Sequence, residues 1–390
     1  MRSVHWLAAL VVVGCGGTHV SPFDTDSGTG NDAGVGNDAS GCPFCGVDGG
    51  NSDGAPTCDP NPANYDIPGN GCDDDGDGII DNPQGTCDTG LPTTSPSATQ
   101  FSKAIGICPG KGDTWGVTSA TYTQGVGSTA APMAQQYGDV ATFGTNVPAR
   151  QGSVLGILSS GVAAAMDCGD GQDKGNVCSN TGPGSPPTGY PKAATGCPIS
   201  NVANDVVDVV LKIQVPANAK GFTFDFNFYS GEWPEWVCTE FNDSFVAWLT
   251  STAWMGKAGD FNISFDAKNN PVSVNNAFFE TCTSNAPTGC CSTTTAMGCG
   301  SPTATASCIN GPGQLAGTGF EDNGTYCQNP STGGGSTGWL TTKAPAKPGE
   351  VITLQFIIWD TGDPNWDSSV LLDNFKWVRG PTTTGTQPAQ

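Results

Sequence analysis

The sequence predicts a mainly β fold: a two-sheet antiparallel β-sandwich of jelly-roll-like type, preceded by a disordered acidic stalk. Several segments after residue 200 alternate apolar and polar residues with period two, and turn residues separate them, which predicts the sandwich. Gly and Pro, with 56 and 29 residues, make about a fifth of the chain against a usual share of roughly an eighth. The first hundred residues are rich in Asp, Gly and Ser and lack this periodicity, which predicts the stalk.

The N-terminal segment predicts export. Arg2 precedes the apolar run WLAALVVV, which is too short to span a bilayer, since that takes about 20 residues. The run ends in VVGC, which resembles a bacterial lipobox, so we expect residues 1–15 to be a lipoprotein signal peptide ending at a lipidated Cys15. An ordinary secretory signal peptide followed by a disulfide cysteine is the alternative.

Residues 16–57 are the low-complexity stalk, and residues 58–90 form an acidic segment bounded by cysteines. This segment contains a D-x-D-x-D-G loop, whose alternate residues converge on one point while the glycine takes the sharp turn. The loop resembles the calcium loops of thrombospondin type 3 and dockerin-like repeats. Position 12 is Gln84 in place of a bidentate Glu, which predicts weak binding; an acidic linker without metal is the alternative. The expected calcium ligands are Asp73, Asp75, Asp77, the carbonyl of Ile79, and Asp81.

The sandwich domain is expected over residues 91–380, followed by a disordered tail, 381–390. A short helix is expected within 98–108. Phe222, Phe224, Phe226 and Phe228 alternate along one predicted strand, so they share one face, and burying each contributes roughly 1.5–3 kcal/mol. The predicted strands are 205–215, 221–229, 243–250, 351–359 and 369–378.

The charge and the residue counts limit the possible functions. The net charge of -22 repels phosphate backbones, so we expect no nucleic acid partner and regard divalent cations as natural partners. The two histidines are His5 and His19, which excludes a Ser-His-Asp triad, a Cys-His pair and a His-ligated zinc site from the domain. Seventeen cysteines predict an oxidising, extracytoplasmic compartment.

Acidic residues crowd two turns and the starts of two strands of the predicted sandwich. Carboxylates this close repel one another, and a bound cation removes that cost, so we expect one calcium site to join some of these turns. Solvated loop acids are one alternative, and a glycosidase-like acid–base pair of Glu232 and Glu235 is another. The candidate ligands are Glu232, Glu235, Asp243, Asp360, Asp363, Asp367 and Asp373. Trp233, Trp236 and Trp366 lie beside the turns and could stack on sugars or pack internally.

The stretch GFTFDFNFYSGEWPEWVCTEFNDSFVAWL (residues 221–249) resembles the core motif of the choice-of-anchor L domain. That family shows a phenylalanine-rich strand, a Ser-Glu-Glu-Tyr-Pro-Glu-like turn and an Asn-Asp-Val-Phe-like strand start. Here Gly231 replaces the first Glu, and Trp233 replaces the Tyr. Residues 141–161 and 359–375 are similar to the family's early and closing segments. The resemblance implies a bacterial surface protein and carries no general enzymatic activity.

The number of cysteines predicts one disulfide. Without Cys15, five cysteines lie between residues 42 and 87 and eleven from residue 108 onward. Both numbers are odd, so complete pairing needs an odd number of bridges between the two groups. Cys87 and Cys108 are the nearest pair across that boundary, and we expect a bridge between them.

Together these features predict a lipid-anchored bacterial protein of the cell envelope, at the outer membrane or cell surface, with a calcium-stabilised β-sandwich that binds or adheres. Its expected partners are the membrane, through the lipid, and an extracellular glycan or protein. No catalysis is expected. The alternatives are an exported hydrolase that works through carboxylates and a purely structural envelope protein.

Overall fold

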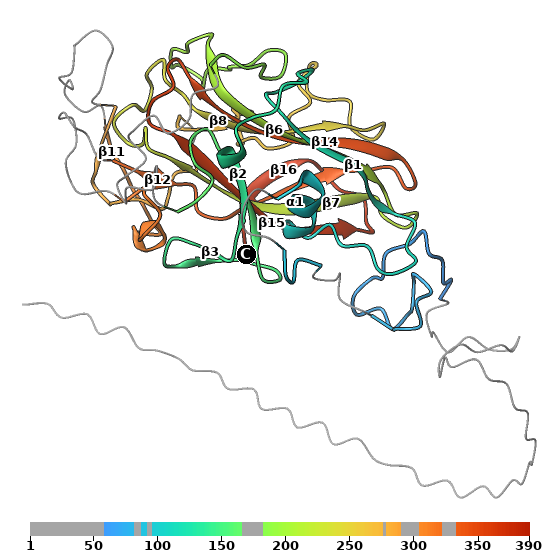
Figure 1. The fold of residues 1–390 in the computed structure, drawn as a ribbon. Coiled ribbons are helices and arrows are strands. Elements are labelled where there is room, and N and C mark those ends of the chain that lie inside the picture. The colour runs from blue at the N-terminus through green and yellow to red at the C-terminus, as the bar shows by residue number, and fades with distance from the viewer. Residues whose placement is uncertain are drawn as a thin grey trace, which may run out of the picture. The chain divides into compact units, whose positions relative to one another are not determined.

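The structure is a computed structural model, and it describes residues 58–81, 87–91, 96–165, 182–275, 278–289, 304–321 and 333–390. The predicted signal peptide with Cys15 and the predicted stalk over 16–57 lie outside the described residues. From residue 58 on, the described residues belong to one compact unit (Figure 1).

One sheet has five antiparallel strands in the order β1-β6-β14-β8-β9. Its strands are β1 (Gly116–Thr123), β6 (Ala203–Gln214), β14 (Val351–Thr361), β8 (Ser244–Thr250) and β9 (Val272–Ser273). The other sheet has seven strands, with the order β16-β13-β7-β15-β5-β2 and with β12 pairing beside β7. These strands are β16 (Gly385–Pro388), β13 (Leu340–Pro345), β7 (Gly221–Ser230), β15 (Ser368–Val378), β5 (Leu155–Ser159), β2 (Tyr137–Val140) and β12 (Gly335–Ser336).

The remaining elements are short. They are α1 (Ala98–Ala104), the 3₁₀ turns η1 (Ala134–Gln136) and η2 (Gly313–Leu315), and the small ribbons β3 (Thr142–Phe143) with β4 (Val147–Pro148) and β10 (Pro287–Thr288) with β11 (Ala304–Thr305). Ser97 and Gln100 form a capping box that fixes the start of α1. Of the helices in the described ranges, none is long and apolar enough to cross a membrane.

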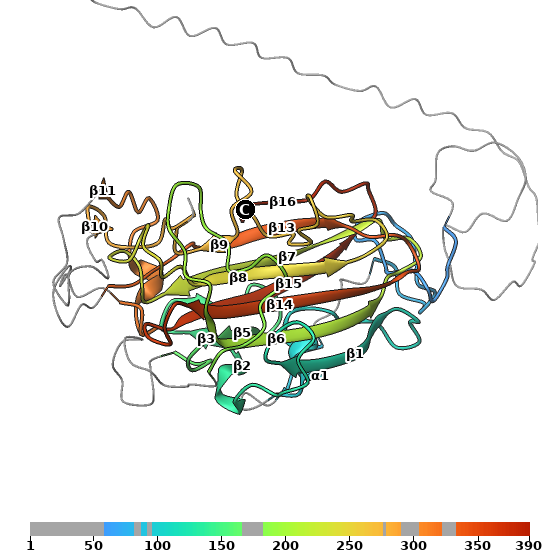
Figure 2. The ribbon, with the colours of Figure 1, turned by 90° about the horizontal axis from the view of Figure 1, so that it is seen from above.

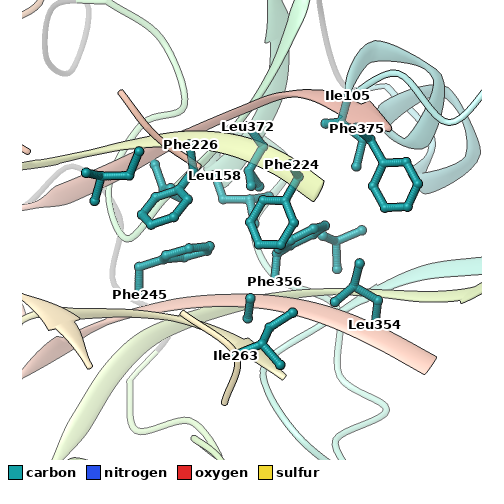
Figure 3. Packing of buried hydrophobic residues seen from close by; sticks show 14 of the residues in the cluster. Ile105, Leu158, Phe224, Phe226, Phe245, Ile263, Leu354, Phe356, Leu372 and Phe375 are labelled. Carbon is teal, nitrogen blue, oxygen red and sulfur yellow. The ribbon is translucent and has the colours of Figure 1, made fainter. Parts of the chain in front are cut away.

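The two large sheets stack face to face, and their long strands run in nearly the same direction (Figures 1 and 2). Phenylalanines of β7 meet phenylalanines of the opposite sheet between the layers (Figure 3). The ring centroids of Phe224 and Phe356 are 5.0 Å apart, and those of Phe226 and Phe245 are 4.9 Å apart. The predicted two-sheet antiparallel sandwich is therefore confirmed.

Strand β7 is covered on both faces, which the alternating pattern does not predict. Its four phenylalanines are at most 1% exposed, as expected for a face turned to the core. Of the residues between them, Asp225 and Asn227 are buried too, and Thr223 is half-buried. Tyr229 packs against Phe143 and Phe320, with centroids 5.1 and 5.4 Å away, because loops and short ribbons cover the outer face of the sheet.

All five predicted strands are present, and α1 lies within the predicted helix. Strand β1 was not predicted, because its sequence GVTSATYT is mostly polar. The prediction of a disordered tail over 381–390 is wrong: β16 pairs with the edge strand β13, from Leu340 opposite Pro388 to Lys343 opposite Gly385. Backbone hydrogen bonds to an edge strand order this tail. Such pairing does not require a hydrophobic pattern, so the sequence gives no sign of it.

The acidic segment packs on the sandwich, so a boundary at residue 91 does not describe the fold. Tyr65 is 3% exposed and belongs to the main hydrophobic cluster. Its backbone N–H donates to Asn218 Oδ1 at 3.0 Å, and its carbonyl accepts from Asn218 Nδ2 at 2.8 Å. The N–H of Thr114 donates to the carbonyl of Pro62 at 2.8 Å.

Disulfides tie this segment further. The eight cysteines of the described ranges form the bridges Cys58–Cys72, Cys87–Cys108, Cys197–Cys238 and Cys282–Cys308. The bridge between Cys87 and Cys108 is the one that the cysteine numbers predict, and its Cα atoms are 5.5 Å apart. The bridge between Cys197 and Cys238 fastens the acidic turn that follows β7.

Candidate metal sites

The Asp loop, residues Asp73–Asp81, brings three carboxylates together. Within the described residues, Asp73, Asp75 and Asp77 are the one group of three or more His, Cys, Asp or Glu side chains whose ligand atoms all lie within 4.8 Å of one another. Gly78, with φ of 90°, takes the left-handed turn that position 6 of such a loop requires. The structure thus places three of the five predicted ligands at one point.

The backbone holds these carboxylates in place. Asp73 accepts from the N–H of Gly76 at 2.8 Å and from that of Gly78 at 3.0 Å. Asp75 and Asp77 each accept from the N–H two residues further on, at 3.0 and 2.8 Å. These bonds fix the side chains without adding positive charge, so the cluster keeps its attraction for a cation.

Asp75 connects the Asp loop to the body of the protein. It is 5% exposed, and burial raises its pKa to about 6, with the charges of Asp77, Asp113 and Asp66 also acting in that direction. Asp113 lies just before β1, so the loop and the sandwich share one region of negative charge. A cation at the loop would relieve repulsion from both.

The other two predicted loop ligands are placed differently. The carboxylate of Asp81 points to the residues just before the Asp loop, where it accepts from the backbone N–H groups of Asn70 at 2.9 Å and Gly71 at 3.1 Å. It lies outside the group of three, so its direct role as a ligand is not supported. The side chain of Ile79 is 57% exposed, as expected for a residue that would contribute its carbonyl.

A second group of acids, the acid row, lies in the interior at one end of the sandwich. It consists of Glu232 after β7, Asp243 before β8 and Asp360 near the end of β14. The register brings these ends together, since Ser244 pairs with Trp359. Glu232 is 2% exposed, and the other two are fully buried.

Contacts between carboxyl groups run along the acid row. The N–H of Asp243 donates to Glu232 Oε2 at 3.4 Å, and the charge of Asp243 raises the pKa values of both Glu232 and Asp360. Asp243 also accepts from the N–H of Thr361 at 2.9 Å and from the Ser368 hydroxyl at 2.7 Å. Both oxygens of Asp360 are buried without a hydrogen bond of ordinary geometry, although Ser160 lies close enough to lower its pKa.

Burial is the main cause of raised pKa values in the acid row. Desolvation raises the pKa of Asp243 to about 7, and the charge of Asp363 adds to it. The pKa values of Glu232 and Asp360 also rise well above their ordinary values, through burial first and the charge of Asp243 second. No Lys or Arg is among the main influences on these three groups, so protons or a cation must offset their charge.

The seven acids predicted to form one domain site are thus only partly assembled. Asp367 and Asp363 add their charges to the row from the turn between β14 and β15. Asp373 lies elsewhere: it accepts from the N–H groups of Arg150 and Gln151 at 2.6 and 3.1 Å. The prediction that Asp373 belongs to the domain site is wrong, because its position on β15 places it opposite Asp225 and away from the turn.

Glu235 and Asp367 are buried against glycines. A Cβ on Gly333 would lie 2.3 Å from Glu235 Oε2, and one on Gly161 would lie 1.8 Å from Asp367 Oδ2, so neither glycine can be replaced without a shift. With Glu232 at 2% and Glu235 at 0% exposure, a polysaccharide cannot reach this pair as it stands in the fold. The glycosidase-like arrangement of open, facing carboxylates is not formed.

The three tryptophans differ in exposure. Trp233 is 7% exposed and stacks on Phe279 with centroids 4.6 Å apart, so its prediction as a ligand platform is wrong. Trp236 and Trp366 are only half-buried, and Trp236 meets Phe241 edge-on at 5.2 Å. Their role in ligand stacking stays a prediction.

Sequence reasoning missed several buried acids. Asp205 and Asp208 lie on the central strand β6 and are fully buried. Asp205 raises the pKa of Asp360, and burial raises the pKa of Asp208 to about 8. Two acids inside the apolar run DVVDVV are a visible signal, since a central strand rarely takes charges without a partner.

Comparison with known proteins gives one match. A family model described as Choice-of-anchor L domain matches residues 110–376, which is more than half of the chain. No curated protein and no solved structure matches the chain.

Proposed function

The chain belongs to the choice-of-anchor L family, and on this premise we propose that it is a lipid-anchored bacterial surface protein with a calcium-stabilised binding or adhesion module. The family and the disulfides make it a β-rich module of extracellular or cell-surface character. The family is not typically enzymatic. The lipid anchor, the bound calcium and the binding role are the parts of the proposal that go beyond family membership.

The convergence of Asp73, Asp75 and Asp77 carries the calcium proposal. Three carboxylates within 4.8 Å in a D-x-D-x-D-G loop suit a hard cation of the size of calcium, which takes oxygen ligands in flexible geometry. With Gln84 at position 12, a dissociation constant of about 10⁻⁴–10⁻³ M is expected, as for other extracellular modules.

The position of the Asp loop explains why calcium would stabilise the whole module. The loop follows Tyr65, which is buried in the main cluster and hydrogen-bonded to Asn218. Ordering the loop therefore supports the packing of a core residue. The Cys58–Cys72 bridge closes the same segment immediately before the loop, so the ion and the disulfide act on one element.

A calcium titration of the full chain tests this proposal. We use the Cys15→Ser variant, which cannot be lipidated, and follow thermal unfolding with calcium and with chelator. Calcium at ten times the dissociation constant should stabilise by about 1.4 kcal/mol. Asp77→Asn should lose much of this gain, whereas Asp59→Asn, an exposed acid of the same segment, should keep it. Equal calcium responses of the two variants would contradict the loop site.

The anchor and the ligand need separate tests. Chains with Cys15 should partition with membranes, and Cys15→Ala chains should not. For the binding role, a glycan array probed with the Cys15→Ser chain should show calcium-dependent binding that Trp236→Ala or Trp366→Ala weakens. Binding that neither change affects would remove these side chains from the proposal, and a chain that binds no glycan would leave protein ligands or a structural envelope role.

A further inference from the structure

A third group of acidic and hydroxyl oxygens, which includes neither the Asp loop nor the acid row, is buried beneath α1. Asp139 on β2 pairs with Gly156 on β5, and residues opposite each other in an antiparallel pair point to the same face. A Cβ on Gly156 would lie 2.7 Å from Phe101 and 2.8 Å from Ile105 of α1 and its C-cap. The side chain of Asp139 therefore lies on the face of β2 that α1 covers, and Phe101 and Ile105 pack directly on Gly156 beside it.

Tyr122 of β1 reaches the same space. Its ring stacks on Tyr137, with centroids 3.8 Å apart, and Tyr137 lies two residues before Asp139 on the same face of β2. The Tyr122 ring also meets Phe101 of α1 edge-on at 6.0 Å. Its hydroxyl is buried and has no hydrogen-bond partner.

Asp88 supplies the third side chain. It is 2% exposed, and its Oδ2 accepts from the backbone N–H groups of Ser153 at 2.5 Å and Val154 at 2.8 Å, just before β5. Its other oxygen, Oδ1, is buried without a partner. The charge of Asp88 acts on Asp139, whose pKa burial raises to about 7, and the charge of Asp139 in turn raises the pKa of Tyr122, after burial.

Four oxygen atoms of these three residues are buried without partners: Asp88 Oδ1, both carboxylate oxygens of Asp139, and the Tyr122 hydroxyl. Asp139 is fully buried, and no Lys or Arg is among the main influences on its pKa. Two buried carboxylates need protons or a cation to offset their charge, and an all-oxygen set suits a hard cation. We propose that Asp88, Asp139 and Tyr122 bind a divalent cation of the calcium class beneath α1.

This site would hold residues 87–91 against the sandwich. Asp88 directly follows Cys87. The disulfide partner of Cys87 is Cys108, which lies four residues after the end of α1 at Ala104. A cation between Asp88 and Asp139 would connect this junction to β2 and β5 of the seven-stranded sheet. The ion and the disulfide would together fasten residues 87 and 88 to the sandwich.

The test measures calcium bound per chain by equilibrium dialysis, with the full chain carrying Cys15→Ser and Asp77→Asn so that the Asp loop does not contribute. We expect about one calcium fewer per chain after Asp139→Asn. Tyr122→Phe keeps the stacked ring and removes only the hydroxyl, so it should weaken binding several-fold. Asp208→Asn is the matched control: it neutralises another fully buried acid, which has its own hydrogen bonds to Thr123 and Gln355, and it should leave binding unchanged.

Unchanged binding in both Asp139→Asn and Tyr122→Phe would overturn the proposal, as would equal losses in these variants and in Asp208→Asn. Terbium gives a second readout, since Tyr122 would sensitise its luminescence at this site. The signal should fall in Tyr122→Phe and be displaced by calcium. If Asp139→Asn does not fold, Tyr122→Phe still decides the question. A failed Asp loop leaves this result intact, because the loop is already inactivated in the background.

Discussion

The Asp loop and the acid row both gather carboxylates, but their surroundings are opposite. The loop is a local segment in which Asp77 is exposed and each carboxylate accepts a backbone N–H. The acid row is buried and joins groups from β7, β8 and β14 that are up to 128 residues apart in sequence, from Glu232 to Asp360. Three carboxylate oxygens converge in the loop, whereas the acids of the row influence one another mainly through burial and charge.

This difference shows two ways to keep acids close together. In the loop, water and a cation can offset the charge, so its stability should depend on calcium. In the acid row, burial disfavours ionisation, and shared protons are the simplest source of neutrality. The row should therefore respond to pH more than to calcium.

The largest expected difference is in stability without calcium. Asp243→Ala removes the acceptor of the Thr361 N–H and the Ser368 hydroxyl and leaves both buried, so it should cost about 3 kcal/mol of unfolding free energy. Asp77→Ala removes one bond at an exposed position and should cost less than about 1 kcal/mol. Urea unfolding of both variants in chelator measures this. Equal losses of unfolding free energy would mean that the acid row contributes no more to stability than the Asp loop does.

The second prediction concerns pH. Asp243 has an ordinary pKa of 3.8 and a folded pKa of about 7, so between these values the folded chain retains a proton that the unfolded chain has released. Its contribution to stability is complete below pH 4 and is lost as the pH rises to 7. The unfolding free energy should fall by up to about 1.4 kcal/mol per pH unit for this proton.

Two variants identify the group responsible. Asp243→Asn should reduce the slope of the unfolding free energy against pH by the amount that corresponds to about one proton. Ser368→Ala removes a hydroxyl that lowers the pKa of Asp243, so it should move the loss of stability to higher pH. Denaturant unfolding across this pH range in chelator provides the measurement. A slope that is the same in wild type and in Asp243→Asn would assign the dependence to other buried acids, such as Asp139 or Asp208.

The sequence predicts these two regions unequally, for physical reasons. The Asp loop is encoded by spacing within a few residues, so the converging positions of Asp73, Asp75 and Asp77 can be identified without a fold. The acid row depends on which strand ends meet. Sequence reasoning found Glu232, Asp243 and Asp360 as acids near turns, but it could not exclude Asp373, because the register of β15 against β7 decides where that side chain lies.

The same distinction holds for the fold. Period-two patterns predict β6, β7, β8, β14 and β15, whose side chains fill the core. Strand β1 and strand β16 lack the pattern because one is mostly polar and the other is ordered by backbone pairing at a sheet edge. The group beneath α1 was also missed, since Asp88, Tyr122 and Asp139 have no spacing rule in common, and Tyr122 and Asp139 lie on strands of different sheets.

The third prediction uses salt, which screens exposed charges much more than buried ones. Raising sodium chloride from about 0.02 M to about 0.5 M shortens the screening length to a few ångströms, so calcium affinity of the Asp loop should fall several-fold. The pH dependence due to Asp243 should change little, because that group is fully buried. Calorimetric calcium titrations and pH-dependent unfolding at both salt concentrations test this. A loop affinity that does not change with salt would indicate a site shielded from solvent.

The smallest expected effect belongs to Asp81. Although it occupies position 9 of the loop pattern, its carboxylate accepts from the N–H groups of Asn70 and Gly71 and lies outside the group of three. Asp81→Asn should therefore change calcium affinity by less than about threefold, since it removes only a distant charge, partly screened by solvent. Asp75→Asn, which removes a member of the group, should reduce affinity by at least about tenfold, or about 1.4 kcal/mol. Calcium titration of both variants in the Asp139→Asn background isolates the loop. If Asp81→Asn weakened binding as much as Asp75→Asn, the carboxylate of Asp81 would have to leave Asn70 and Gly71 when calcium binds, and the loop would close around the ion instead of being formed in advance.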